Sequence, residues 1–335
     1  MAAAKRAIGK FDVHPVGLGC MNLSHAYGPA QEHNTAVDFL RHALDIGYNF
    51  FDTATIYGMG GNEKLIGEAL SGHRDEFVLA SKCVMGFKDG QRFLDGRPET
   101  IKAACEASLE RLRTEVIDLY YMHRPDPAVA IEESVGALGD LVKAGKIQMI
   151  GLSEMSAETL RRAHAEHPIA AMQSEYSLMT RNPEIAVLQA CRELGVTFVP
   201  FSPVGRGYLA DQPLNPDAFH DGDLRKTFPR YTDPHHSANL TLLNFAREQA
   251  AQLECSVAQL ALAWTLAQDP NCVPIPGTTH LGHLADNHAA ADLKIPETIM
   301  TALNETFAPQ AVSGARYSPA AQATVTTERF AFEID

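Results

Sequence analysis

Short apolar runs alternate with longer amphipathic runs along almost the whole chain. A short run bounded by turn residues is typical of a buried strand, and apolar residues three or four positions apart are typical of a helix that covers a sheet. The predicted strands are residues 16–21, 50–54, 78–81, 117–122, 147–152, 170–173, 197–201 and 273–275. The predicted helices are residues 35–46, 62–70, 98–112, 131–143, 157–166, 184–194, 238–252, 257–268 and 284–291.

This alternation predicts an α/β protein built from eight strand–helix units, a (β/α)8 TIM barrel with long loops on its C-terminal face. A doubly wound open sheet is the alternative, but it usually carries a glycine-rich turn after its first strand. The segment Gly17-Leu18-Gly19 has only two of the expected glycines. No linker divides the chain, so we expect a single domain over residues 1–335, with a small hairpin at 5–13 and an irregular C-terminal tail from about 308.

Composition narrows the function classes. The 335 residues carry a net charge of −13, which argues against a general DNA-binding surface because such a surface needs a basic face. The six cysteines form no C-x-x-C pair and no zinc-like spacing, as expected for reduced thiols. Residues 1–10 lack an apolar signal core, and no run approaches a membrane span. We therefore expect a cytoplasmic protein without nucleic-acid or membrane partners.

Three successive predicted strands end in polar side chains. Asp52 ends a buried apolar run, and Tyr57 follows five residues later beside Gly58. Lys82 and His123 stand directly after the next two predicted strands. Because barrel strands place their carboxyl ends side by side, these four residues are predicted to meet at one mouth of the barrel. In isolation each has an ordinary structural role, such as a turn cap for Asp52, but their shared position favours a chemical one.

The four side chains suit the reduction of a carbonyl group. A phenol ordinarily titrates near 10 and is a weak acid, and the ammonium of Lys82 would lower that pKa. Asp52 would keep Lys82 charged, and His123 would hydrogen-bond the same substrate oxygen as Tyr57. No protein side chain supplies a hydride, so this chemistry requires a nicotinamide cofactor.

The four residues and the segments around them resemble those of the aldo-keto reductase family. The matching segments are residues 17–21, 51–54, 57–58, 62–63, 65–67, 81–82, 118–120, 123, 151–154, 173–178, 201–203, 205–207, 274–278 and 287. The resemblance covers residues 10 to 290 or so. It implies reversible NAD(P)H-dependent reduction of a small-molecule aldehyde or ketone on a barrel. It also implies that Tyr57 is the proton donor, that Lys82 and Asp52 tune it, and that His123 orients the carbonyl.

The resemblance also implies a cofactor site. Ser153, Glu154 and Gln173 would hold the nicotinamide carboxamide, Phe201 would stack on its ring, and Asn287 would meet the adenine. Many relatives have asparagine at the position of Glu154, whose carboxylate can still accept from an amide. The complete implied set is Gly19, Cys20, Met21, Asp52, Ser153, Glu154, Gln173, Phe201, Ser202, Pro203, Val204, Gly205, Arg206, Gly277, Thr278, Thr279, His283 and Asn287.

The choice between NADPH and NADH depends on the 2′-phosphate. Relatives that prefer NADPH usually carry Lys or Arg just after the Pro-Gly-Thr turn, where this chain has Thr279, His280 and His283. The long loop at 205–236, which we expect to close over the cofactor, offers substitutes in Arg225, Lys226 and Arg230. We therefore expect NADPH, with NADH as the alternative.

Two other functions stay open. One is a regulatory barrel subunit that binds the cofactor with little turnover. The other is a metal-dependent barrel hydrolase using Asp52, His123 and Glu175, but the first predicted strand lacks the H-x-H pair common in that class, so we expect no metal. Within the family that the chain resembles, a monomer or a small homo-oligomer is expected.

Overall fold

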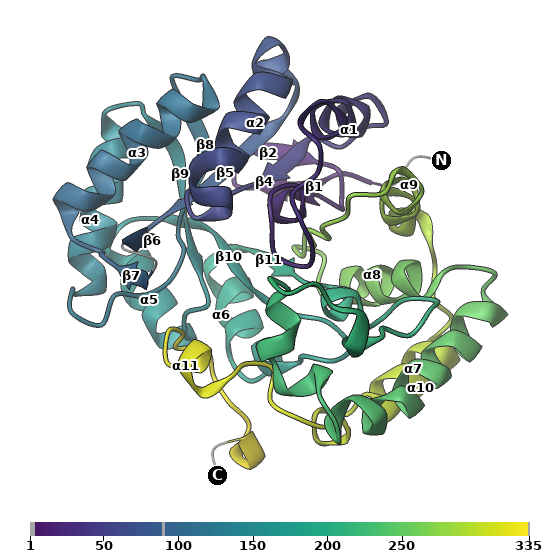
Figure 1. Cartoon of the computed structure of the whole chain (residues 1–335). Coiled ribbons are helices and arrows are strands. Elements are labelled where there is room, and N and C mark those ends of the chain that lie inside the picture. The colour runs from purple at the N-terminus through teal and green to yellow at the C-terminus, as the bar shows by residue number, and fades with distance from the viewer. Residues whose placement is uncertain (1–3, 89–90, 334–335) are drawn as a thin grey trace.

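Seven parallel strands and one further segment close into a barrel (Figure 1). The computed structural model describes residues 4–88 and 91–333. The strands run in the order β11-β10-β9-β8-β5-β4-β3. Their bounds are β3 Leu18–Gly19, β4 Phe50–Asp52, β5 Val78–Cys83, β8 Ile117–Met122, β9 Ile147–Ser153, β10 Ile169–Glu175 and β11 Thr197–Phe201.

Residues 272–276 complete the barrel. On one side the amide of Val273 donates to the carbonyl of Phe198 at 2.9 Å. On the other side the amide of Gly17 donates to the carbonyl of Pro274, also at 2.9 Å. The segment therefore lies between β11 and β3 as the eighth strand, which confirms the predicted (β/α)8 barrel. The first predicted strand is shorter than expected, because residues 21–23 turn into a 3-10 helix.

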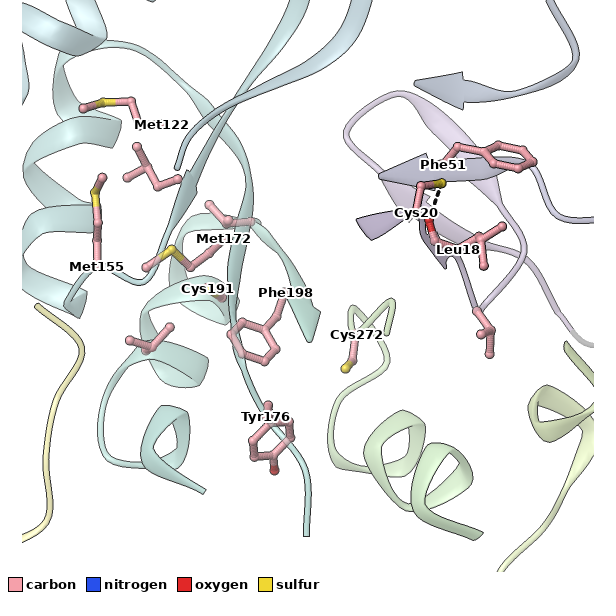
Figure 2. Packing of buried hydrophobic residues seen from close by; sticks show 14 of the residues in the cluster. Leu18, Cys20, Phe51, Met122, Met155, Met172, Tyr176, Cys191, Phe198 and Cys272 are labelled. Atoms are coloured by element: carbon pink, nitrogen blue, oxygen red, sulfur yellow. Dashed lines mark hydrogen bonds between the residues drawn. The ribbon is translucent and has the colours of Figure 1, made fainter. Parts of the chain in front are cut away.

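Strand residues alternate between two apolar layers, because successive side chains point to opposite faces. In β8, Leu119 and Tyr121 point into the barrel, where they pack with side chains such as Phe50. Tyr120 and Met122 point outward against the helices. Figure 2 shows part of this outer layer, which includes Met122, Met172 and Phe198. Burial on both faces explains why the strands read as continuous apolar runs.

The helices surround the barrel (Figure 1). Their bounds are α1 His33–Asp45, α2 Gly61–Leu70, α3 Pro98–Leu112, α4 Ile131–Lys143, α5 Ala157–Glu166, α6 Val187–Leu194, α7 His235–Gln252, α8 Val257–Gln268, α9 Leu281–Ala289, α10 Glu297–Thr306 and α11 Pro319–Gln322. Local signals fix several ends: Ser256 and Gln259 form a capping box at α8, and Gly195 ends α6 with φ of 67°. Most predicted bounds agree within three residues; α10 and the short α11 were not predicted.

An antiparallel hairpin closes the amino-terminal end of the barrel. Strands β1 Arg6–Ile8 and β2 Phe11–Val13 pair around Gly9, whose φ of 54° suits glycine. Ile8 and Val13 are fully buried in the interior cluster. A second hairpin, β6 Met85–Lys88 and β7 Gln91–Leu94, follows β5 and was not predicted.

The C-terminal segment packs on the barrel although residues 308–333 contain only short helical turns. The amide of Thr326 donates to the carbonyl of Glu154 at 3.0 Å. The carboxylate of Glu328 accepts from the amide of Ala157 at 2.7 Å, at the start of α5. Within residues 4–88 and 91–333, no helix combines the length and apolar character that a membrane crossing requires.

Candidate active site

The carboxyl ends of the barrel strands open into a cavity of about 1710 Å³. This exceeds a typical drug-sized pocket, so it has room for a dinucleotide and a second small molecule. Its wall comes from strand ends, from the loop at 205–236 and from the C-terminal segment. The predicted site residues that line it are Gly19, Met21, Asp52, Tyr57, His123, Ser153, Gln173, Phe201, Ser202, Pro203, Val204, Arg206, Gly277, Thr278, Thr279, His283 and Asn287.

An ion pair lies at the inner end of this cavity. Lys82 on β5 is fully buried, and its Nζ donates to Asp52 Oδ1 on β4 and, at 2.8 Å, to the carbonyl of Thr53. The other carboxylate oxygen of Asp52 accepts from Nε2 of Gln173 at 2.8 Å. Burial lowers the pKa of Lys82 and raises the pKa of Asp52, and the attraction within the pair opposes both changes.

Tyr57 lies beside this pair, at the start of the 3-10 turn Tyr57–Gly60. The centre of its ring is 5.1 Å from Nζ of Lys82 and 5.8 Å from the ring of His123, which meets it edge-on. The fold therefore brings the four residues predicted to act together into one cluster. Three of them reach it from the ends of β4, β5 and β8, because parallel strands end at one rim.

The electrostatics of Tyr57 differ from the expectation. The sequence predicts that Lys82 lowers the pKa of the phenol. In the structure burial dominates, followed by the charge of Asp52, and the pKa of Tyr57 lies well above its ordinary value. Burial, and then Arg124, lower the pKa of His123 well below its ordinary value. At neutral pH the pair is therefore a protonated phenol and a neutral imidazole.

The segment that follows β11 bends sharply along the cavity. Ser202 and Arg206 have φ of 50° and 53°, and the neighbouring Gly205 and Gly207 also have positive φ. Such a conformation strains non-glycine residues, and strained residues are enriched at functional sites. At the far end of the cavity, Thr278 and Thr279 stand just before α9 and Asn287 lies within it.

Glu154 does not lie where the sequence predicts. It is fully buried outside the cavity lining, and its carboxylate accepts from Arg316 Nη1 at 3.1 Å and Nη2 at 2.7 Å. It also accepts from the amide of Glu175 at 2.8 Å. No oxygen remains directed at a carboxamide, so the prediction for Glu154 is corrected. The partner, Arg316, is 162 residues away in the sequence and carries no local signal.

Three other predicted residues also lie behind the cavity wall. Cys20 is buried, and its thiol donates to the carbonyl of Leu18 at 3.6 Å in the outer apolar layer (Figure 2). Gly205 is buried and its carbonyl accepts from the hydroxyl of Tyr231 at 2.7 Å. Lys82 does not line the cavity, but its ion-pair partner Asp52 does.

Arg206 lines the cavity with a largely compensated charge. Its Nη2 donates to Glu175 at 2.7 Å, and the guanidinium lies 4.6 Å from the ring centre of Phe228 and 5.3 Å from that of Tyr317. The side chain therefore joins the long loop and the C-terminal segment to β10.

The long loop crosses the cavity. The amide of Leu224 donates to the carbonyl of Ala26 at 2.9 Å, and the guanidinium of Arg225 lies 4.7 Å from the ring centre of Tyr27. Arg225 lines the cavity, whereas Arg230 is buried and donates to the carbonyl of Met179. Lys226 does not line the cavity either, and it pairs with Asp221 on the surface at 3.1 Å. Of the three cations suggested for the 2′-phosphate, only Arg225 therefore lines the cavity.

Several lining residues were missed by sequence reasoning. Tyr317, Ser318 and Thr324 come from the C-terminal segment, and no local pattern indicates that this segment returns to the strand ends. Arg124 and Arg92 also line the cavity. Arg124 has a simple signal, since it directly follows His123.

The charges around Glu175 bear on the metal-dependent alternative. Two of the three residues considered as ligands are already paired, Asp52 with Lys82 and Glu175 with Arg206. Within residues 4–88 and 91–333, no three His, Cys, Asp or Glu side chains cluster closely enough to hold a metal ion.

The comparison that decides the family is a match over most of the chain. A sequence model of the Aldo/keto reductase family matches residues 15–307. The chain belongs to this family. A relative from Schizosaccharomyces pombe, named aldo-keto reductase yakc [NADP(+)], is 41% identical over 331 residues and 96% of each chain. A probable aldo-keto reductase 1 from Glycine max is 40% identical over 92% of this chain and 89% of its own.

Solved structures agree with this aldo/keto reductase assignment. The glycerol dehydrogenase AKR11B4 from Gluconobacter oxydans has a TM-score of 0.83 at 25% identity, over 95% of this chain and 99% of that one. An aldo-keto reductase from Klebsiella pneumoniae in complex with NADPH has a TM-score of 0.70 at 26% identity, with the same coverage. The predicted oxidoreductase class is confirmed by these relatives.

Proposed function

We propose that the protein reduces an aldehyde or ketone to an alcohol with NADPH, and that Tyr57 donates the proton. One observation carries this proposal: Tyr57 and His123 meet at the inner end of the cavity, directly in front of the buried Lys82–Asp52 pair. A proton donor, a neutral hydrogen-bonding group and a fixed positive charge at one point are what carbonyl reduction requires.

The donor groups in the cavity fit a dinucleotide. Ser153 and Gln173 would hold the carboxamide, and Nε2 of Gln173 already donates to Asp52, which leaves its carbonyl oxygen as an acceptor. Phe201 would stack on the ring. Thr278 and Thr279, before the amino-terminal end of α9, would meet a phosphate. A bound reduced nicotinamide supplies the hydride that the side chains lack.

Each of the four residues has a distinct role in this proposal. Tyr57 stays protonated because burial raises its pKa, and it gives its proton to the carbonyl oxygen. His123 stays neutral because burial lowers its pKa, and it hydrogen-bonds the same oxygen. Lys82, held by Asp52, stabilises the phenolate that remains after the proton is transferred.

Replacement of Tyr57 by phenylalanine tests the proposal. Tyr57→Phe is expected to lower kcat by about 100-fold or more, because general acid catalysis contributes on that scale. It should leave the Kd for NADPH within about threefold of the wild type, since the hydroxyl is not part of the proposed cofactor site. NADPH oxidation with a reactive aldehyde and NADPH fluorescence measure the two quantities. Cofactor binding with no wild-type turnover over a broad aldehyde panel would instead identify a regulatory subunit.

NADPH rather than NADH is proposed from the relatives, one named for NADP(+) and one solved with NADPH. In this chain Thr279 and His283 are the lining residues available to a 2′-phosphate, whereas the guanidinium of Arg225, which also lines the cavity, is paired with Asp223 at 2.6 Å. The ratio of kcat/KM for the two cofactors tests the choice, and a large preference for NADH would contradict it. We also propose a cytoplasmic enzyme, since all six cysteines are free thiols and suit a reducing compartment.

A further inference from the structure

Arg124 presents a positive charge to the inner end of the cavity. It follows His123 at the end of β8 and is half-buried. Its Nη1 donates to the carbonyl of His123 at 2.6 Å and to the hydroxyl of Ser153 at 3.3 Å. Within residues 4–88 and 91–333, its Nη2 makes no hydrogen bond and no carboxylate lies within 4.0 Å of the guanidinium.

Other arginines that are buried or half-buried have their charge satisfied within the protein. Arg74, Arg111, Arg206 and Arg316 each pair with a carboxylate, at 2.6 or 2.7 Å. Within residues 4–88 and 91–333, Arg6 and Arg230 pair with no carboxylate, but each donates to neutral oxygens through two of its nitrogens. Such satisfaction is expected, because a charge removed from water costs free energy unless an opposite charge or hydrogen bonds offset the loss. Arg124 has neither a carboxylate nor a second hydrogen-bonding nitrogen in the part of the chain that the structure describes, which leaves its charge open to an anion from the cavity.

A second arginine, Arg92, lies at the rim of the cavity. Arg92 on β7 is exposed and lines the cavity, with its guanidinium 5.8 Å from the ring centre of Phe87. The two arginines face the end that holds Tyr57 and His123. The proposed phosphate contacts are on other segments, at residues 202–206 and 277–279. An anion bound at Arg124 is therefore part of the substrate rather than of the cofactor.

We infer that the substrate is an aldehyde or ketone that also carries a carboxylate, and that Arg124 binds this carboxylate while Tyr57 and His123 bind the carbonyl oxygen. The inference rests on the proposed function and narrows its substrate class. A planar guanidinium with a free Nη2 matches a carboxylate in shape and charge. Arg92 strengthens the attraction from the rim, where water screens its charge more strongly.

Matched substrates test this inference. 4-Carboxybenzaldehyde and methyl 4-formylbenzoate share a ring and an aldehyde, but only the first is an anion. The wild type is expected to prefer the first by about 10- to 100-fold in kcat/KM, mainly through KM, as charged hydrogen bonds are worth that much. Arg124→Gln should lower the ratio of kcat/KM for the acid and the ester to about one, whatever its effect on the ester alone. Arg124→Lys should keep part of the preference for the acid. Arg92→Gln should lower this preference by less than Arg124→Gln does.

Arg161→Gln is the matched control, because Arg161 is exposed on α5 and pairs with Glu193 on the surface. Binding of the product 4-(hydroxymethyl)benzoate and of its methyl ester to the NADP⁺-loaded enzyme, measured by calorimetry, gives a readout without turnover. Tighter binding of the acid that Arg124→Gln abolishes would support the inference. Equal reduction of both aldehydes by the wild type would overturn it and leave the proposed function intact. An equal loss for both substrates in Arg124→Gln would also overturn it, since Arg124 would then serve the reaction or the fold.

Discussion

Two of the buried ion pairs near the carboxyl ends of the barrel strands differ in what holds their partners. Lys82 and Asp52 lie on neighbouring barrel strands, with side chains 0% and 2% exposed. Glu154 and Arg316 are equally buried, at 0% and 5%, but Arg316 belongs to the C-terminal segment. The first pair is fixed by the hydrogen bonds of the sheet, whereas the second joins a strand end to a segment with little regular structure of its own.

The difference sets how each pair responds when it is broken. A barrel strand cannot move away from its neighbours without unfolding the sheet, so an unpaired charge at Asp52 or Lys82 would stay buried. The C-terminal segment can separate locally and let water reach Glu154, so the loss there is limited to the free energy that docks the segment. Tyr317, next to Arg316, lines the cavity, so this local change would reach the substrate side.

The largest effect is expected for the barrel pair. Lys82→Met leaves Asp52 buried with Gln173 as its remaining side-chain partner. The free energy of unfolding should fall by about 3–5 kcal/mol, the usual cost of breaking a buried pair, and kcat by about 100-fold. Urea unfolding and NADPH oxidation measure the two effects. A Lys82→Met protein with wild-type stability would show that the pair can relax after all.

A smaller and more local effect is expected for the second pair. Arg316→Met should lower the free energy of unfolding by less than Lys82→Met, raise KM for bulky carbonyls several-fold, and change kcat for a small aldehyde by less than about threefold. Glu154→Gln combined with Arg316→Met should recover part of the stability, since no charge then stays unpaired. Arg162→Gln, which breaks an exposed pair with Glu132, is the control. A loss of kcat equal to that of Lys82→Met would remove the distinction between the two pairs.

The smallest effect is expected from pH. An acid catalyst is active in its protonated form, and burial raises the pKa of Tyr57 well above its ordinary value. Because the pKa of His123 is lowered, it too should not titrate near neutrality. The kcat for reduction should therefore be flat between about pH 6 and 9, with an alkaline loss only above the usual phenol range. A tenfold fall in kcat per pH unit starting near neutrality would show that Lys82 outweighs burial.

The same two pairs show how far the sequence could be read. Asp52 and Lys82 follow consecutive apolar runs, and parallel strands of a barrel end side by side, so their meeting could be predicted from order alone. Glu154 also follows a strand, and its predicted position at the nicotinamide came from the resemblance to relatives with asparagine there. The structure differs because Arg316, far away in the sequence, takes both carboxylate oxygens. No periodicity or spacing indicates such a partner.

What the sequence alone determined is the barrel, its order of elements and the cluster of Asp52, Tyr57, Lys82 and His123. Apolar periodicity and the ends of strands are local properties, and the closed barrel turns them into fixed neighbours. What only the tertiary structure decided is the wall of the cavity: the crossing of the long loop, the return of the C-terminal segment, and the free guanidinium of Arg124. These features depend on contacts between residues far apart in the sequence and on which charges are paired in the folded protein. Neither can be predicted from local sequence patterns.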